Sequence, residues 1–404
     1  MKKWGLVFLC ILMTGMPMSG QTLPATGATD LDSALQSAVR QGTVPGIVAM
    51  VASKNRILYQ GAGGLKDVAN KQAITQDAIF RIASMTKPVT SVAIMMLQEE
   101  GKLSVDAAVS KYLPAFKNPD IIVSFDEISG AYTTRKAAGE LLIRHLLTHT
   151  SGIAYAFSNV MANRLQQRGK LPEAPPLLYE PGTQWAYGPS TKILGKIVEA
   201  VSGMPLDDFF AQRIFNPLGM SDTSFVVPPE KKTRVVTVHR RQNGILVETP
   251  NPDAISSPVA GDGGLNSTAA DYVKFLQMLL NNGEGNGRRI LRKASVQAMI
   301  KNQIGQVVVV TQPAVIPGTS QAFPIGAGRD KFGFGFQITM PNNGDWSLRS
   351  PGSYSWAGIY NTHFWVDPKR RIAGVILMQV LPFYDEGCMK VYQDFETAIG
   401  RNVR

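Results

Sequence analysis

The two ends of this chain carry its strand-forming segments, and this placement limits the possible folds more than any other feature. Apolar, β-branched and aromatic residues between turn-forming residues predict strands at residues 46–52, 57–60, 332–340, 358–366 and 372–380. Strands complete their hydrogen bonds only by pairing with other strands. We therefore expect one antiparallel sheet that is built from both termini.

The middle of the chain has helical periodicity instead. Apolar spacing predicts helices at residues 84–100, 141–147, 192–201, 207–215 and 270–280, and two more near the ends, at 31–40 and 385–399. The expected fold class is α/β (α+β), an antiparallel sheet flanked by helices with an inserted, mainly helical domain.

The domain boundaries follow from this division. Residues 27–83 and 325–404 are expected to form the sheet domain, and residues 84–324 the inserted domain. Residues 306–328 are apolar and proline-rich. A surface loop, an edge strand and a lid or pocket wall are all compatible with that composition.

The first twenty residues have the parts of a secretory signal peptide. Lys2 and Lys3 form a basic start, residues 4–13 form an apolar stretch, and Gly20 precedes an expected cleavage near Gln21. The apolar stretch is short for a membrane anchor. We therefore expect residues 1–20 to be removed and the mature protein to be periplasmic or secreted.

The cysteines and the charge distribution indicate which bonds and binding partners are not expected. Cys10 lies in the signal, so the mature chain would keep only Cys388 and form no internal disulfide. The net charge is +11, but the basic residues are scattered and no basic stripe is interleaved with aromatics, so nucleic-acid binding is not expected. The mature region has no stretch long and apolar enough for stable membrane insertion. The sequence does not indicate an oligomeric state.

One short motif points to a nucleophile. The chain lacks Gly-x-Ser-x-Gly, His-Glu-x-x-His, a Walker loop and Gly-x-Gly-x-x-Gly. Its single Ser-x-x-Lys is formed by Ser84 and Lys87, where a helix is expected to begin. The spacing places both side chains on one helical face. Unpaired N–H groups at a helix start favour negative charge on the serine, and Lys87 would help to deprotonate or stabilise it.

Around this motif the sequence resembles the class C β-lactamase-like serine hydrolases, which are similar to penicillin-binding proteins. The matching segments keep that family's order over about residues 30–400. They are FRIASMTKP (80–88), RHLLTHTSG (144–152), PGTQWAYG (181–188), NPLGMSDT (216–223), GDGGL (261–265), Asp271-Tyr272, Trp356-Ala357-Gly358 and FWVDP (364–368). The resemblance implies a sheet domain with an inserted helical domain, and acyl-enzyme chemistry in the cleft between them.

The resemblance also implies roles for single residues. Ser84 would attack the carbonyl carbon, with Lys87 as its partner. Tyr187 would be the general base, as a phenolate or through a proton shared with Lys87; a free phenol has a pKa near ~10, so it needs cations nearby. Trp356-Ala357-Gly358 would lie on a strand along the cleft. The backbone N–H groups of Ser84 and Ile359 would form the oxyanion hole.

The resemblance implies no metal or organic cofactor. His145 and His149 have a spacing that suits a metal, but no third ligand is evident, and the family gives this segment a structural role. The glycine-rich run at 261–264 is expected to allow a tight backbone near the cleft.

Two positions depart from the penicillin-recognising pattern. Tyr-x-Asn becomes Tyr187-Gly188-Pro189, so an amide-binding side chain is missing, with Ser190 as the nearest polar substitute. Trp356 replaces the lysine of Lys-Thr-Gly and makes the subsite more apolar. Trp-x-Gly at this place resembles the family VIII carboxylesterases. We therefore expect hydrolysis of small-molecule carboxylic esters.

Two alternatives stay open. The same site would suit a β-lactamase or a peptidase or amidase that acts on D-amino-acid amides. A penicillin-binding or regulatory protein with little turnover is a candidate of another class. The presence of Ser84, Lys87 and Tyr187 together argues against this last candidate, because binding alone does not need the full set.

Overall fold

The computed structural model describes residues 21–126, 128–169, 171–341 and 348–403. The expected signal peptide lies outside the described residues. The central sheet has the strand order β12-β13-β14-β15-β16-β1-β2-β3, and neighbouring strands pair antiparallel. Its strands are β1 (Gly46–Ser53), β2 (Ile57–Asp67), β3 (Gln72–Ala73), β12 (Lys331–Phe332), β13 (Gln337–Ile338), β14 (Tyr354–Gly358), β15 (Thr362–Asp367) and β16 (Ile372–Leu377). Because β1 pairs with β16, the prediction of one antiparallel sheet from both ends of the chain is confirmed.

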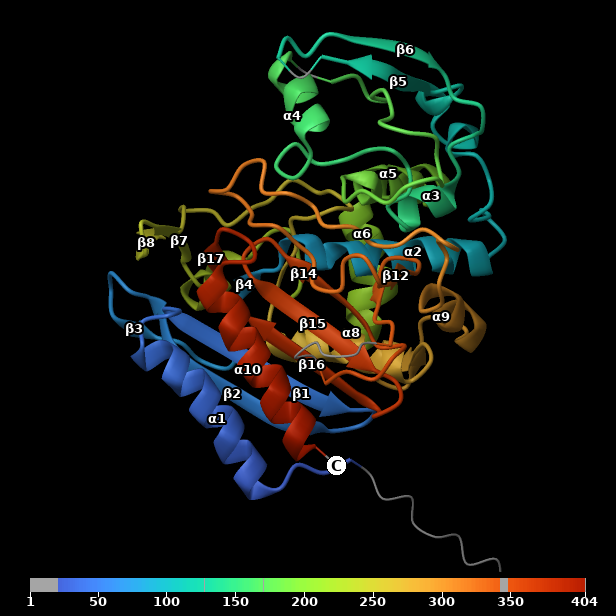
Figure 1. Cartoon of the computed structure of the whole chain (residues 1–404). Helices are drawn as coiled ribbons and strands as arrows, with labels where there is room; N and C mark the ends of the chain where they lie inside the picture. The colour runs from blue at the N-terminus through green and yellow to red at the C-terminus, as the bar shows by residue number, and fades with distance from the viewer. Residues whose placement is uncertain (1–20, 127, 170, 342–347, 404) are drawn as a thin grey trace, which may run out of the picture.

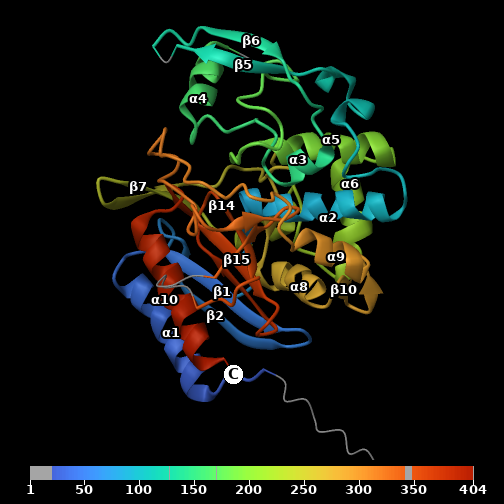
Figure 2. The same ribbon diagram turned by 45° about the vertical axis from the view of Figure 1, so that its right-hand side comes forward.

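Helices cover both faces of this sheet. Figure 1 shows α1 (Ala25–Arg40) and α10 (Glu386–Asn402) side by side on one face. On the opposite face, α8 (Ala269–Leu280) packs against β1 and β16 (Figure 2). β1 is buried along its whole length because its apolar side chains meet a helical layer on each side.

The two layers bury large apolar side chains. Leu31 of α1 and Phe395 of α10 are fully buried on one face, and Tyr272 and Phe275 of α8 on the other. Each such side chain contributes on the order of 1.5–3 kcal/mol by leaving water. The buried side chains on the two faces hold the helices against the sheet. The sheet in turn positions β14 beside the candidate site.

Most remaining elements lie in the upper part of Figures 1 and 2, with the hairpin β5–β6 and α4 outermost. The helical elements are η1 (Ala83–Met85), α2 (Thr86–Glu99), η2 (Val109–Lys111), η3 (Pro114–Phe116), α3 (Ile143–Leu147), α4 (Val160–Gln167), α5 (Ser190–Ser202), α6 (Leu206–Phe210), η4 (Ala211–Phe215), α7 (Asn216–Leu218), η5 (Pro229–Arg234) and α9 (Lys293–Met299). The short strands are β4 (Phe80–Arg81), β5 (Asp120–Phe125), β6 (Tyr132–Lys136), β7 (Val238–Gln242), β8 (Ile245–Thr249), β9 (Asn266–Ser267), β10 (Glu284–Gly285), β11 (Arg288–Arg289) and β17 (Val380–Leu381). Within the described ranges, no helix has both the length and the apolar character that crossing a bilayer requires.

Three predicted strands were wrong in extent. Residues 332–340 form β12 and β13 with a turn between them, because Gly335 adopts a left-handed φ of 94°. Residues 358–366 are interrupted after β14 by a turn at Asn361, whose φ is 57°. The Asn361 side chain donates hydrogen bonds to the carbonyls of Val380 and Pro382, which holds this turn. The third predicted strand, residues 372–380, ends at Leu377.

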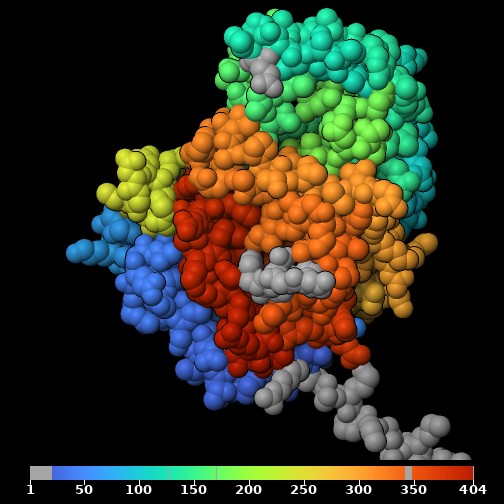
Figure 3. Space-filling view, in the orientation of Figure 1, coloured from blue at the N-terminus to red at the C-terminus, as the bar shows by residue number. Residues whose placement is uncertain are grey.

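Residues 306–328 form no strand of the central sheet, and the end of this segment lines the central cavity. Phe323, Pro324 and Ile325 line the cavity that also contains Ser84. In the space-filling view, the orange segment around residues 300–340 contacts both the red C-terminal part and the green middle of the chain (Figure 3). Backbone hydrogen bonds between Gln312 and Phe323, in both directions, stabilise this segment.

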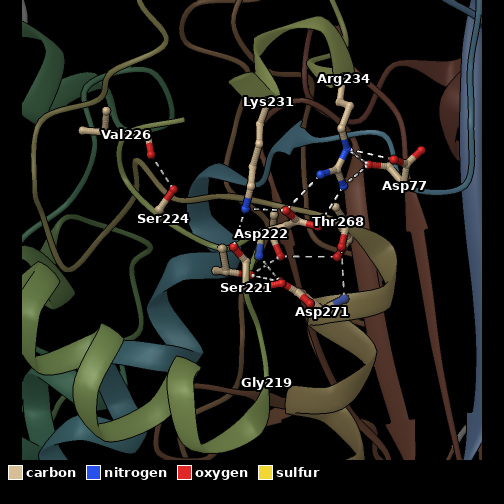
Figure 4. A network of polar contacts seen from close by, with 12 residues as sticks. Asp77, Gly219, Ser221, Asp222, Ser224, Val226, Lys231, Arg234, Thr268 and Asp271 are labelled. Atoms are coloured by element: carbon tan, nitrogen blue, oxygen red, sulfur yellow. Dashed lines mark hydrogen bonds and ion pairs between the residues drawn. The ribbon is translucent and has the colours of Figure 1, made fainter. Parts of the chain in front are cut away.

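A network of charged residues fastens the N-terminus of α8 (Figure 4). Arg234 donates to both carboxylate oxygens of Asp222 at 3.0 and 2.8 Å, and Lys231 lies 2.9 Å from the same group. Arg234 above all holds the pKa of Asp222 down to about 2, against the burial that raises it. Asp222 N–H donates to Asp271, whose own N–H is capped by Thr268. The network thus anchors the chain directly after β9, which pairs with the strand that leads to Ser84.

Candidate active site

Ser84 stands at a sharp turn between β4 and α2. Ala83 adopts a φ of 44°, and the 3₁₀ turn η1 then leads into α2, which begins at Thr86 rather than at Ser84. Lys87 lies in the first turn of α2 and is 1% exposed. Its Nζ lies 3.0 Å from Ser84 Oγ. The sequence spacing therefore brings a buried amine into hydrogen-bond contact with the serine hydroxyl.

Two further partners hold the Lys87 amine. Nζ donates to the backbone carbonyl of Asp262 at 2.7 Å and to the hydroxyl of Tyr155 at 3.1 Å. A buried cation is tolerated only when it has such partners. Together with Ser84, these contacts use all three N–H groups that an ammonium carries.

Tyr187 lies against this amine but does not receive its hydrogen bond. Its ring centroid is 4.8 Å from Lys87 Nζ, and the residue is 3% exposed. The Tyr187 backbone accepts from the N–H of Tyr155 and donates to the side chain of Gln312. The two tyrosines are therefore held next to each other, and Tyr155 is the one bonded to Lys87.

Tyr155 and Asp262 are site residues that sequence reasoning missed. The Tyr155 hydroxyl donates to Asp262 Oδ2 at 2.6 Å. Burial, and then the neighbouring Asp262 charge, raise the pKa of Tyr155 well above its usual range. Asp262 lies inside the glycine-rich run that was expected near the cleft, and a carboxylate there was the available signal. Tyr155 lies three residues after Gly152, and no local pattern connects it to Asp262.

The strand β14 carries Trp356, Ala357 and Gly358, as expected. A Cβ at Gly358 would lie 2.3 Å from the carbonyl oxygen of Ile82, so only glycine lets β14 approach the segment that leads to Ser84. Ile359 follows β14 directly and lines the same cavity as Ser84. The oxyanion hole formed by Ser84 and Ile359 stays a prediction that this placement allows.

Trp356 belongs to an aromatic cluster around Tyr187. Its ring centroid lies 5.0 Å from that of Tyr187 and 5.4 Å from that of Phe332. His149 joins the cluster, with its ring centroid 5.0 Å from that of Tyr187. Burial, followed by the charge of Lys87, holds the pKa of His149 well below its usual range. His149 is therefore a neutral packing residue beside the site.

Ser190, expected near the substrate, does not line the cavity. It is fully buried at the start of α5, and its hydroxyl lies 2.8 Å from that of Ser151. The interpretation of Ser190 as a substitute for the missing asparagine is therefore wrong. The residue directly after Pro189 turns into the helix instead of toward the substrate space.

The two histidines with helical spacing have separate tasks. His145 Nδ1 accepts a hydrogen bond from the backbone N–H of Leu142, and burial lowers the pKa of His145 to about 4. His149 packs in the aromatic cluster described above. The described residues contain no group of three metal-ligating side chains.

Ser84 opens into a cavity of about 280 Å³. Much of its lining is aromatic and includes Tyr155, Phe157, Tyr187, Phe323 and Trp356. The lining also includes Arg349, which binds both carboxylate oxygens of Glu396 at 2.9 and 2.7 Å, so its charge is locally compensated. The cavity that Ser84 lines thus offers an apolar aromatic surface.

Comparison with known proteins identifies the family. The family model "Beta-lactamase" matches residues 31–399. The chain belongs to the beta-lactamase family. The ML-236A carboxylate methylbutanoyltransferase mlcH of Penicillium citrinum is 27% identical, covering 93% of this chain and 95% of that protein. Esterase EstB of Burkholderia gladioli is also 27% identical, covering 85% of this chain and 88% of that protein.

A solved structure has the same fold. Simvastatin synthase (LovD) of Aspergillus terreus superposes with a TM-score of 0.80 at 25% identity, covering 93% of this chain and 98% of that chain. The β-lactamase/transpeptidase fold is therefore confirmed. The chain is an enzyme of the β-lactamase-fold group of serine hydrolases and acyltransferases.

Proposed function

We propose that this enzyme hydrolyses small-molecule carboxylic esters through an acyl group on Ser84. The observation that carries the proposal is the 3.0 Å contact between Lys87 Nζ and the hydroxyl of Ser84, which lines an aromatic cavity. A serine hydroxyl is a weak nucleophile unless a neighbouring group takes its proton. Lys87 Nζ contacts Ser84 Oγ directly, and the Tyr187 ring centroid lies 4.8 Å from the same amine.

The reaction has two halves in this proposal. Ser84 Oγ attacks the ester carbonyl, and the N–H groups of Ser84 and Ile359 stabilise the oxyanion. The alcohol leaves with the proton that Ser84 gave up, and water then releases the acyl group. An alcohol in place of water would give acyl transfer, the activity for which the relative mlcH is named.

The side chains around the nucleophile favour esters over amides. Pro189 supplies neither a side-chain donor nor an N–H where penicillin-recognising enzymes have asparagine. Trp356 presents an indole, packed on Tyr187, where those enzymes have a cationic lysine. An amide or β-lactam would therefore lose two polar contacts, each worth on the order of 1–3 kcal/mol.

The expected result is a strong preference for p-nitrophenyl butyrate. Two lost contacts lower amide turnover by roughly 10²–10⁴-fold relative to a true β-lactamase. The measurement is kcat/KM for p-nitrophenyl butyrate, nitrocefin and a D-alanyl-D-alanine peptide under the same conditions. If nitrocefin or the peptide is the better substrate, the enzyme belongs with the β-lactamases or peptidases and the proposal is rejected.

We also propose that the protein is exported to the periplasm or secreted. The signal-like residues 1–20 end shortly before α1, which begins at Ala25, so cleavage would leave the described fold whole. The mature protein is expected to start near Gln21 or Thr22 outside the cytoplasm. N-terminal sequencing of the active protein from its native compartment tests this. Recovery of Met1 on active, membrane-bound protein would favour an anchor instead.

A further inference from the structure

We propose that Tyr155 and Asp262 form a positioning pair that directs the lone pair of Lys87 at Ser84, so that Lys87 is the group that takes the serine proton. The inference rests on the proposed acylation of Ser84 and assigns the proton acceptor within it. It gives roles to two residues outside the Ser-x-x-Lys and tyrosine motifs.

The argument starts from the three atoms around Lys87 Nζ. They are Ser84 Oγ at 3.0 Å, the Tyr155 hydroxyl oxygen at 3.1 Å and the Asp262 carbonyl oxygen at 2.7 Å. A charged amine can donate to all three. A neutral amine has only two N–H groups and one lone pair, so one of the three partners has to donate to it.

Two of the three partners have no proton available for the amine. The Asp262 carbonyl oxygen is an acceptor only. The Tyr155 hydroxyl proton is already given to Asp262 Oδ2 at 2.6 Å, so toward Lys87 its oxygen can only accept. The remaining partner is Ser84, whose hydroxyl carries a proton. The neutral amine therefore satisfies every partner in one orientation, with its lone pair toward Ser84.

The pair is held firmly enough to impose this orientation. Thr90 of α2 donates to the Gly261 carbonyl at 2.7 Å, and Thr86 accepts from the N–H of Leu265 at 3.3 Å, so the segment with Asp262 is fixed to the helix that carries Lys87. Burial and the Asp262 charge raise the pKa of Tyr155, so Tyr155 keeps its proton. It therefore positions the amine and is not itself the base.

The acylation step balances with these residues alone. The Ser84 proton moves to the Lys87 lone pair, and the serine oxygen forms a bond to the ester carbonyl carbon while the carbonyl π electrons move to oxygen. The oxyanion collapses, the C–O bond to the alcohol breaks, and the alkoxide takes the proton back from Lys87. The face of Tyr187, 4.8 Å from Nζ, stabilises the ammonium that exists in between.

A double-mutant cycle tests the pair. The variants are Tyr155→Phe, Asp262→Ala and the double variant, with Tyr112→Phe as the matched control, because the buried Tyr112 hydroxyl has no hydrogen-bond partner among the described residues. The readout is the single-turnover rate of acylation by p-nitrophenyl butyrate, together with KM and the melting temperature of each variant. Asp262→Asn is a shape-conserving companion that keeps an acceptor oxygen for Tyr155.

Each single change is expected to slow acylation on the order of 10–10²-fold, because a misdirected amine loses the near-attack geometry, while KM stays nearly constant. Asp262 acts through Tyr155, so the double variant is expected to be no slower than Tyr155→Phe. Asp262→Asn is expected to recover part of the loss.

Three results would overturn the positioning pair: multiplicative losses in the double variant, a normal acylation rate in either folded single variant, or an Asp262→Asn variant as slow as Asp262→Ala. A wild-type protein that forms no acyl-Ser84 would instead refute the proposed function itself. The two failures are thus distinguishable in one set of measurements.

Discussion

Replacing Ser84 with alanine is expected to lower kcat/KM for p-nitrophenyl butyrate on the order of 10⁴–10⁶-fold, as loss of a serine nucleophile does elsewhere. The reason is that Ser84 Oγ, bonded to Lys87 Nζ, is the atom that becomes acylated in this account. The change removes one oxygen at a turn whose backbone is held by the Ile82 N–H bond to Leu265. The fold is therefore expected to remain, with a melting temperature close to that of the wild type.

Ser37→Ala on α1 is a suitable control, because α1 covers the opposite face of the sheet from α8 and lies away from the cavity. It is expected to keep wild-type activity. A folded Ser84→Ala protein that still hydrolyses the ester at more than a small fraction of the wild-type rate would move the nucleophile to another residue.

Replacing Lys87 with methionine is expected to lower the acylation rate by roughly 10²–10⁴-fold, the range of a proton-transfer group. Methionine fills much of the same buried volume and removes only the amine that contacts Ser84, Tyr155 and Asp262. The loss is expected to appear in kcat, since the amine acts on the nucleophile and not on the bound ester. Combining it with Ser84→Ala should add almost nothing, because the two residues act as one unit.

The control for this change is Lys196→Met, which removes an exposed lysine paired with Glu173 on the surface of α5. It is expected to leave kcat unchanged. A Lys87→Met enzyme with a near-normal rate would transfer the role of base to Tyr187, whose ring lies next to the same position.

The sequence predicted the architecture well where the signal is local. The apolar run that became β1 and the helical spacing in α8 and α10 are properties of neighbouring residues, and they placed the sheet and its layers. The ends of β14 and β15 were misplaced because the turn between them depends on Asn361, whose side chain bonds to the distant Val380 and Pro382 carbonyls. The hairpins β5–β6 and β7–β8 were missed within the region expected to be mainly helical.

The site residues also differ in whether a local sequence pattern could predict them. Ser84 lies in η1 and Lys87 in the first turn of α2, only three positions apart, so the short spacing together with the family resemblance predicted their contact. Tyr155 and Asp262 lie 107 positions apart in the chain and meet only through folding, so no local pattern revealed them. The prediction for Ser190 was wrong although Ser190 is close to Tyr187 in the sequence. Its hydroxyl contacts that of Ser151 instead of facing the cavity.

The most direct test of the account is to trap the acyl-enzyme. The wild-type protein is mixed with p-nitrophenyl butyrate, quenched in acid during the first turnover, digested and analysed by mass spectrometry. The account predicts a butyryl group on the peptide that contains Ser84, and its absence from the same peptide of the Ser84→Ala variant. A butyryl group on a different residue, or ester turnover without any covalent adduct, would contradict it.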